Sequence, residues 1–161
     1  MGESTVIAHA LLTIVAITMA SVFAGVVIFG SYDIGNSIQA LYNSMADRMR
    51  TDIVIAYISF DPATLTYYVY AKNTGSSPIN SLDTTTIFFG PEGGVLDFYT
   101  YDPNGTTGTW YYVEHGTQNQ VWEVGEVLEI VIVAGKDYGG VVKLVMVVPT
   151  GAKISYVEPI G

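Results

Sequence analysis

The sequence predicts an α+β fold, in which a long N-terminal transmembrane helix with a stalk precedes an all-β, immunoglobulin-like sandwich. Three observations support this. No Asp, Glu, Lys or Arg occurs among the 29 residues from Ser4 to Tyr32. Apolar residues then recur at helical spacing up to Arg50, and beyond it short β-branched and aromatic runs are separated by turn residues. We therefore expect a helix and stalk over residues 1–50 and a β-sandwich over residues 51–161.

The apolar run from Thr5 to Ser31 is long enough to span a membrane, because ~20 apolar residues cross a hydrocarbon core about 30 Å thick. A cleavable secretory signal is disfavoured, since no basic residue precedes the run and the run exceeds the usual ~7–15 apolar residues. A helix from about Ser4 to Arg50 would be ~70 Å long at 1.5 Å per residue. Its last turns should therefore project beyond the lipid as a stalk.

Two sets of side chains on this helix are candidate packing surfaces. Small residues recur every four positions in the apolar run, which lets helices approach closely in lipid. An apolar stripe with spacings of 4, 3 and 4 continues along the stalk. A generic anchor is the alternative, and the partner could be another copy, another membrane protein or the β-domain itself. The small residues are Ala16, Ala20 and Ala24 with the pair Ser21 and Gly25, and the stripe is Ile34, Ile38, Leu41 and Met45.

Eight short runs after the stalk predict strands. They are rich in Val, Ile, Thr, Tyr and Phe, and Gly, Asn and Pro occur between them, which is typical of a β-sandwich. The chain has no cysteine, so the Cys–Trp–Cys signature of antibody domains is absent and the topology stays open. The expected strands lie within residues 51–60, 64–73, 84–90, 95–101, 109–115, 127–134, 140–149 and 153–159.

Composition excludes several classes of function. Residues 51–161 hold 4 basic and 12 acidic residues, and such a surface repels nucleic-acid phosphates. Without cysteine there is no disulfide, thiolate nucleophile or Cys-ligated metal. His9 and His115 lie in different parts of the chain and the carboxylates are scattered, so we predict no metal site, no cofactor, no small-molecule substrate and no catalysis.

We expect the β-domain outside the cytoplasm, on a single-pass membrane protein at the cell surface. Arg48 and Arg50 would favour the opposite orientation, but they lie at the limit of the range over which the positive-inside rule applies. The acidic, Thr/Tyr-rich composition is typical of an extracytoplasmic domain. Asn104-Gly105-Thr106 is a glycosylation sequon in a turn-rich stretch, which makes Asn104 a candidate glycosylation site.

Several stretches of the sequence resemble those of a known family. The helix "STVIAHALLTIVAITMASVFAG" without a basic region before it resembles archaeal type IV pilin-like proteins and archaellins, and more narrowly the archaellum accessory (stator) protein FlaG family. The stretch "YVYAKNTGSSPINSLDTTTIFFGPEGG" from Tyr68 to Gly94 is similar to the family's strand, "KNTG", "PI" and strand ending in "FG". The later "LDFYTY" and "GEVLEI…VPTGAK" also fit.

The resemblance implies a non-catalytic structural role in the archaeal motility apparatus. Members of that family are membrane-anchored, with a self-associating β-domain between the membrane and the S-layer, and they act with a FlaF partner as the stationary part around the filament. One feature departs from the related filament proteins. A precursor of an archaellin or pilin should carry a short basic leader ending in Gly, and Met1-Gly2-Glu3 leaves no room for one. That fits an unprocessed stator protein, or a trimmed sequence in which Met1 is an addition.

Two alternatives to the stator hypothesis stay open. A filament-forming archaellin or pilin-like subunit would use the same helix to pack in a polymer. A membrane-anchored extracellular binding module would use Trp110, Tyr111 and Tyr112 as an aromatic platform, although half-buried strand positions explain these residues more simply.

Overall fold

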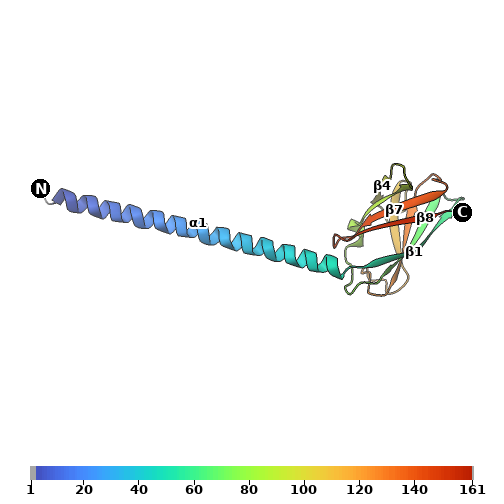
Figure 1. The fold of residues 1–161 in the computed structure, drawn as a ribbon, viewed down its shortest axis with the longest axis horizontal. Coiled ribbons are helices and arrows are strands. Elements are labelled where there is room, and N and C mark those ends of the chain that lie inside the picture. Colours follow the sequence, from blue (N-terminus) through green and yellow to red (C-terminus); the bar gives the residue numbers. More distant parts are fainter. Residues whose placement is uncertain (1–2, 161) are drawn as a thin grey trace. The chain divides into compact units, whose positions relative to one another are not determined.

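The computed structural model describes residues 3–160, with side chains from Thr5 onward. The chain divides into two compact units, one up to Asn43 and one from Ser44, and each is described by itself. The predicted helix is confirmed as α1 (Glu3–Arg50), an uninterrupted helix of 48 residues (Figure 1). At 1.5 Å per residue it is about 72 Å long, more than twice the thickness of a hydrocarbon core.

The end of α1 is fixed by hydrogen bonds that belong to the second unit. The Thr51 hydroxyl donates to the Asp47 carbonyl at 2.8 Å, and the Thr51 amide donates to the Arg48 carbonyl at 3.3 Å. Arg48 and Arg50 lie in the last turn, where their positive charges stabilise the negative end of the helix dipole. The Thr51 hydroxyl also lies 2.9 Å from that of Thr150, which connects the helix end to the loop before the last strand.

All eight predicted strands are present. Their lengths of five to nine residues match the short apolar runs, since each run is bounded by residues that form turns. A single turn of 3-10 helix, η1 (Leu82–Thr84), lies in a stretch that the sequence predicts as loop and strand start. The strands are β1 (Ile53–Asp61), β2 (Thr66–Asn73), β3 (Thr86–Pro91), β4 (Asp97–Tyr101), β5 (Thr109–Glu114), β6 (Val127–Val133), β7 (Val141–Val147) and β8 (Lys153–Pro159).

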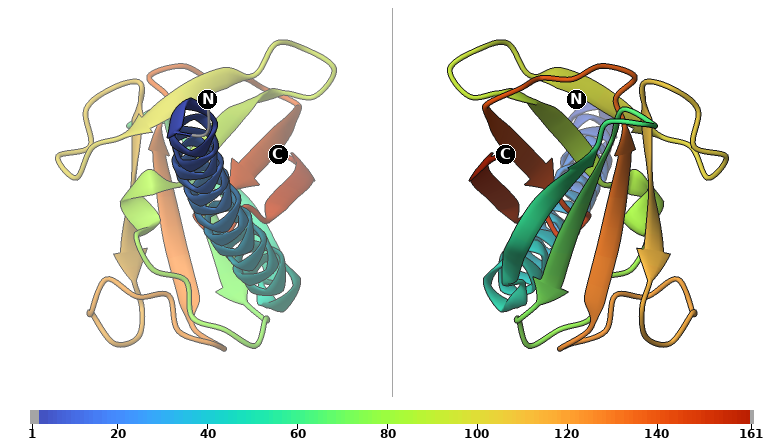
Figure 2. Two further views of the ribbon diagram at one scale, coloured as in Figure 1. Left: turned by 90° about the vertical axis from the view of Figure 1, so that its left-hand side faces the viewer. Right: turned by 90° about the vertical axis from the view of Figure 1, so that its right-hand side faces the viewer.

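The strands form a nearly closed sandwich. Their hydrogen-bonded order is β1-β2-β6-β5-β4-β3-β7-β8, and every pairing is antiparallel except the short parallel one between β4 and β5. This parallel pairing connects two groups of strands, β1-β2-β6-β5 and β4-β3-β7-β8, which Figure 2 shows as two layers. The outermost strands β1 and β8 contact each other, so the sheet nearly returns on itself.

The core lies between the two layers. Tyr67, Val69 and Ala71 of β2 alternate into it and are fully buried, as the period of two in a half-buried strand requires. Trp110 and Trp122 are the largest buried side chains. The Trp122 ring nitrogen donates to the Glu126 carbonyl at 3.0 Å, so this polar tip is satisfied inside the core.

The "KNTG" stretch, which begins in the last two residues of β2, connects three parts of the domain. Asn73 is fully buried, and its side-chain nitrogen donates to the carbonyls of Ser77 and Trp122, both at 3.0 Å. Its side-chain oxygen accepts the Gly75 amide at 3.0 Å. A Cβ on Gly75 would lie 2.3 Å from the Arg50 carbonyl oxygen, so only glycine fits this close approach to the end of α1.

Candidate interaction surfaces

Most of the surface of α1 is apolar, and no described residue of the chain covers its most apolar stretch. Within the described side chains of the helix, all residues are exposed except Gly25 and Ala46, which are intermediate. Phe29, for example, is 73% exposed. The span from Thr5 to Arg50 is long and apolar enough to cross a membrane, with a mean hydropathy of 2.5 in its best window. Such a surface requires an apolar environment that comes from lipid or from other helices.

Hydroxyl groups in the apolar run are satisfied within the helix itself. The Ser21 hydroxyl donates to the Ile17 carbonyl at 2.8 Å, and the Thr13 hydroxyl donates to the His9 carbonyl at 2.8 Å. The Ser31 hydroxyl donates in the same way to the Val27 carbonyl at 2.8 Å. Because these polar atoms are already paired, the small residues present little polar surface to a neighbouring helix.

The small residues and the stalk stripe share one face of α1. Ile34 follows Ala16 by 18 positions, and Ile38 follows Ala20 by the same number, which is about five full turns at 3.6 residues per turn. Ile34, Ile38, Leu41 and Met45 are 48–63% exposed, so the chain leaves this face uncovered from the apolar run into the stalk. We call it the helix seam: Ala16, Ala20, Ala24, Ile34, Ile38, Leu41 and Met45. Ser21 and Gly25 lie on a different face, and a Cβ added to Gly25 would meet no atom within 4 Å.

The outer side of the β1-β2-β6-β5 layer carries an aromatic and aliphatic patch that was not among the surfaces predicted from the sequence. We call it the aromatic face, and it has the Tyr57 ring stacked on the Tyr70 ring at 4.6 Å. Burial and a hydrogen bond to Glu129 raise the pKa of Tyr70 to about 12. The Glu129 carboxylate also pairs with His115 at 2.6 Å. Exposed apolar residues flank these groups in the same layer, namely Val54, Val113 and Val127.

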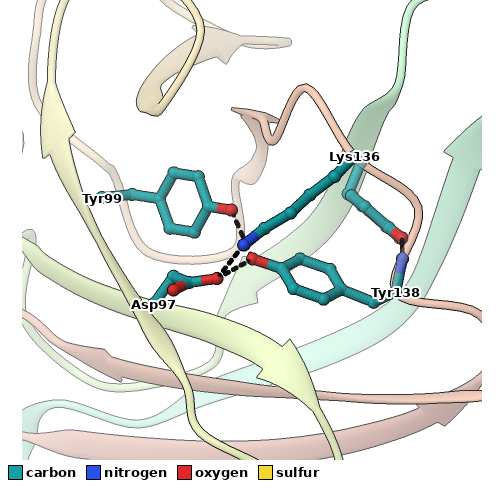
Figure 3. Close-up of polar contacts among 5 residues, drawn as sticks. Asp97, Tyr99, Lys136 and Tyr138 are labelled. Carbon is teal, nitrogen blue, oxygen red and sulfur yellow. Dashed lines mark hydrogen bonds and ion pairs between the residues drawn. The ribbon is translucent and has the colours of Figure 1, made fainter.

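A second polar cluster joins the β6–β7 loop to β4 (Figure 3). Lys136 pairs with the Asp97 carboxylate at 2.7 Å and its ammonium lies 5.1 Å from the centre of the Tyr138 ring. The Tyr138 hydroxyl donates to Asp97 and contacts the Tyr99 hydroxyl at 2.7 Å. Hydrogen bonding to Lys136 and Tyr138 lowers the pKa of Asp97, whereas burial raises the pKa of Tyr138. These groups all have partners, so the cluster fastens a loop and leaves no free acid, base or nucleophile.

Several residues singled out in the sequence do not form a common site in the structure. Trp110 is 1% exposed, so the proposed aromatic platform of Trp110, Tyr111 and Tyr112 is wrong as a surface. Strand alternation explains the result, because Trp110 points into the core and Tyr111 points away from it. His9 belongs to the first unit and His115 to the second. No group of three His, Asp or Glu side chains that could hold a metal occurs within the described residues.

Asn104 lies on the exposed turn between β4 and β5. Its side-chain nitrogen donates to Asp102 at 2.9 Å, and the Thr106 hydroxyl donates to the other oxygen of the same carboxylate at 2.7 Å. The bond from Asn104 to Asp102 and the exposure of Asn104 are compatible with an unmodified asparagine and with a glycosylated one. Glycosylation at Asn104 therefore stays a prediction at this point.

The aromatic face could have been found in the sequence by one signal. In "TYYVYAKN" the outward positions of a half-buried strand are tyrosines, Tyr68 and Tyr70, where polar residues are usual. The Asp97 cluster had no such signal, because its residues come from β4 and from a loop about 40 positions later, which only the folded topology brings together.

The fold resembles solved archaeal structures. The archaellum periplasmic stator protein FlaG from Sulfolobus acidocaldarius superposes with a TM-score of 0.56 at 24% identity, covering 66% of this chain and 98% of that chain. The archaeal flagellum protein of Methanospirillum hungatei strain JF1 superposes with a TM-score of 0.64 at 18% identity, covering 96% of this chain and 93% of that one. At these identities the likenesses establish the fold. The second includes the helix as well as the β-domain.

Sequence comparison extends over almost the whole chain. An uncharacterised protein of Archaeoglobus fulgidus is 27% identical over 124 residues, which cover 74% of this chain and 72% of the relative. Residues 2–158 match the family of archaeal-type flagellins. The match includes both the apolar helix and the eight strands. The chain therefore belongs to the archaeal-type flagellin family.

Proposed function

We propose that this chain is a non-catalytic structural component of the archaellum, a membrane-anchored stator-like protein with its β-domain outside the cytoplasm. The observation that carries the proposal is the uncovered helix. Residues Thr5 to Arg50 form a span with none of its most apolar window buried by the rest of the chain. An apolar surface of this length is stable only in lipid or against other helices, so the chain has to act from within an assembly or a membrane.

The β-domain supports the stator part of the proposal. Its fold is that of FlaG, whose solved structure is described as an archaellum periplasmic stator protein, and a complex of FlaF and FlaG has been solved from the same organism. By analogy, this β-domain self-associates and contacts a FlaF-like partner, and through it the S-layer. The aromatic face is a surface suited to such contacts, since exposed aromatic rings are enriched at protein interfaces.

A filament subunit is the second candidate, and one observation favours it. The likeness to the Methanospirillum hungatei flagellum protein covers 96% of this chain, helix included. The helix seam also continues from the apolar run, which ends at Ser31, to Met45, where no lipid would cover it. In a filament the whole seam would pack against neighbouring helices, whereas in a stator only the stalks of a few copies would pair there.

Fractionation of cells separates the two candidates. A stator protein stays with the detergent-extracted membrane, whereas a filament subunit makes up the bulk of the mass in sheared, purified filaments. Quantitative mass spectrometry of the two fractions measures the ratio. Recovery of most of the chain in sheared filaments contradicts the stator proposal. Recovery mainly in the detergent extract contradicts the filament candidate.

Cysteine cross-linking gives an independent test, because the natural chain has no cysteine. Ala20→Cys places one thiol on the helix seam, and Gly25→Cys places one on a different face. A chain with one cysteine can form only one intermolecular disulfide and therefore gives at most a dimer. Ala20→Cys alone is thus the matched control for the variant that carries both cysteines. The double variant yields a ladder of higher oligomers only when both faces contact neighbours. A stator with one helix contact per copy gives dimers in both cases.

A further inference from the structure

Beyond this role, we infer that Asn104 is N-glycosylated and that its first sugar lies in the adjacent groove between Tyr68 and Tyr111. The groove has a volume of about 440 Å³, within the range of small-ligand sites, and Asn104 itself lines it. The sequon and the groove are separate observations. The first marks the acceptor nitrogen, and the second gives the attached group a place to bind.

The chemistry of the groove matches a neutral, hydroxylated ligand. None of the residues that line it is charged, although the chain as a whole has a net charge of −9. The two tyrosines come from β2 and β5 on either side of β6, where both pair with Val131, and Val133, two residues further along β6, lines the groove. The lining residues are Thr64, Thr66, Tyr68, Pro103, Asn104, Gly105, Tyr111 and Val133.

The two tyrosines offer both surfaces that a sugar ring uses. Their half-buried rings present apolar faces for the C–H groups of the sugar. Their hydroxyls have no hydrogen-bond partner within residues 3–160, unlike the Tyr70 hydroxyl, which is held by Glu129. The Tyr68 and Tyr111 hydroxyls are therefore free to bind sugar hydroxyls at the edge of the groove.

The turn holds Asn104 beside this groove. The backbone amide of Asn104 donates to an Asp102 carboxylate oxygen at 3.0 Å, and the Asn104 side-chain nitrogen donates to the same oxygen at 2.9 Å. Gly105 has a φ of +66° and lies against the Tyr111 ring, where an added Cβ would be 2.9 Å from the ring edge. Hydrogen bonds from Thr106 and Asn104 lower the pKa of Asp102, so the carboxylate stays ionised and keeps the turn in place.

The modification leaves this turn intact. The Asn104 amide nitrogen attacks the anomeric carbon of a lipid-phosphate-linked oligosaccharide, which supplies the sugar. The bond from that carbon to the phosphate oxygen breaks, the lipid phosphate leaves with the electron pair, and one amide proton passes to a base of the transferase. The glycosylated nitrogen keeps one N–H, which suffices for the bond to Asp102.

The inference also limits which surfaces can pack in an assembly. A sugar over Tyr68 and Tyr111 covers the end of the β1-β2-β6-β5 layer that lies near Asn104. The aromatic face, with Tyr57 and Tyr70, lies further along the same strands and stays free. The modification requires the β-domain to lie outside the cytoplasm, so it depends on that part of the proposed function.

Mass spectrometry tests occupancy. The full chain is produced in an archaeal host whose own surface proteins are N-glycosylated, and is cleaved with chymotrypsin after Tyr101 and Trp110. The peptide "DPNGTTGTW" contains the whole sequon and no other Asn. We expect a hexose-type mass on this peptide, its loss in Thr106→Ala, and its retention in Thr106→Ser, which preserves the hydroxyl. An unmodified peptide from protein recovered at the cell surface overturns the inference and leaves the proposed function standing.

Nuclear magnetic resonance of the glycosylated protein tests the groove. Protons of the first sugar should shift upfield under the aromatic ring currents, and Tyr68→Ala or Tyr111→Ala should abolish the shift without changing occupancy. Tyr57→Ala is the matched control, since Tyr57 is a half-exposed tyrosine of the same layer that does not line the groove. Sugar shifts that are the same in all four proteins contradict the placement of the sugar in the groove.

Discussion

Two phenylalanines of this chain differ in the way that its two units differ. Phe29 in α1 is 73% exposed, whereas Phe89 in the β-domain is fully buried. The β-domain buries its apolar side chains between two layers of strands of the same chain, so the hydrophobic effect stabilises it without a partner. The helix has comparable apolar side chains and buries almost none of them. Its stability therefore depends on lipid or on other molecules, and a change in one unit should leave the other unaffected.

The largest effect is expected in the core. Trp122→Ala should lower the free energy of unfolding of the β-domain by about 3–5 kcal/mol, because a fully buried indole and its hydrogen bond are lost. Phe29→Ala is the matched change in the helix and should alter the same quantity by less than about 0.5 kcal/mol. Urea titration in mild detergent, followed by circular dichroism of the strands, measures both. Similar losses in the two variants would contradict the independence of the units.

A smaller effect is expected in the "KNTG" stretch. Asn73→Ala should lower the free energy of unfolding by about 1–3 kcal/mol, because a fully buried side chain with three hydrogen bonds is lost and the Ser77 carbonyl loses its donor. The Trp122 carbonyl and the Gly75 amide keep their backbone hydrogen bonds to Ile79 and Asp52. Asn80→Ala is the control, since Asn80 is exposed and no side-chain hydrogen bond of it is seen in the described part of the chain. Equal stability of the two variants would show that the Asn73 bonds do not hold the domain together.

High pH should weaken the β-domain. The folded state holds the pKa of Tyr70 at about 12, above the ordinary value of 10.0, so an unfolded chain loses this proton first as the pH rises. The contribution is complete below pH 10 and is lost as the pH rises toward 12. Thermal melts from pH 8 to pH 12 should show a falling midpoint. Tyr70→Phe should reduce that slope while costing about 0.5–1.5 kcal/mol at neutral pH.

The smallest effect on the β-domain is expected from a change in the helix. Gly25→Leu should leave the melting midpoint of the strands unchanged, because no atom of the chain lies within 4 Å of an added Cβ. The same variant should reduce association of full-length chains in detergent, measured by light scattering, if close helix packing occurs on that face. A matched Val22→Leu change keeps a large residue and should preserve association. Unchanged association in Gly25→Leu would contradict the use of Gly25 as a packing position.

Local patterns made most of the elements predictable. The helix followed from an uncharged run and a continuing apolar stripe, and the strands followed from short β-branched runs between turn residues, because these signals depend on near neighbours. The single helical turn η1 was not predicted. Ser81 before it adopts a left-handed φ of 56°, which is unusual for serine and which the local sequence does not indicate. The strand order was open because pairing joins residues far apart in the sequence.

The candidate surfaces were predictable only in part. The residues of the helix seam could be named in advance, because helical spacing alone places them on one face. Their packing stays a prediction. On the β-domain, the burial of Trp110 depended on which face of β5 points to the core, and a run of three aromatics does not show this. The aromatic face required the register that aligns Tyr57 with Tyr70 and Glu129 across three strands.

The contact between β1 and β8 concerns the two outer edges of the sheet. Open sheet edges recruit strands from other molecules and lead to amyloid-like aggregation. Here β1 and β8 approach each other without pairing, and β1 carries a register shift between Ile55 and Tyr57 that makes its edge irregular. A strand from another molecule therefore finds an irregular edge at β1, which is a poor template for adding to the sheet.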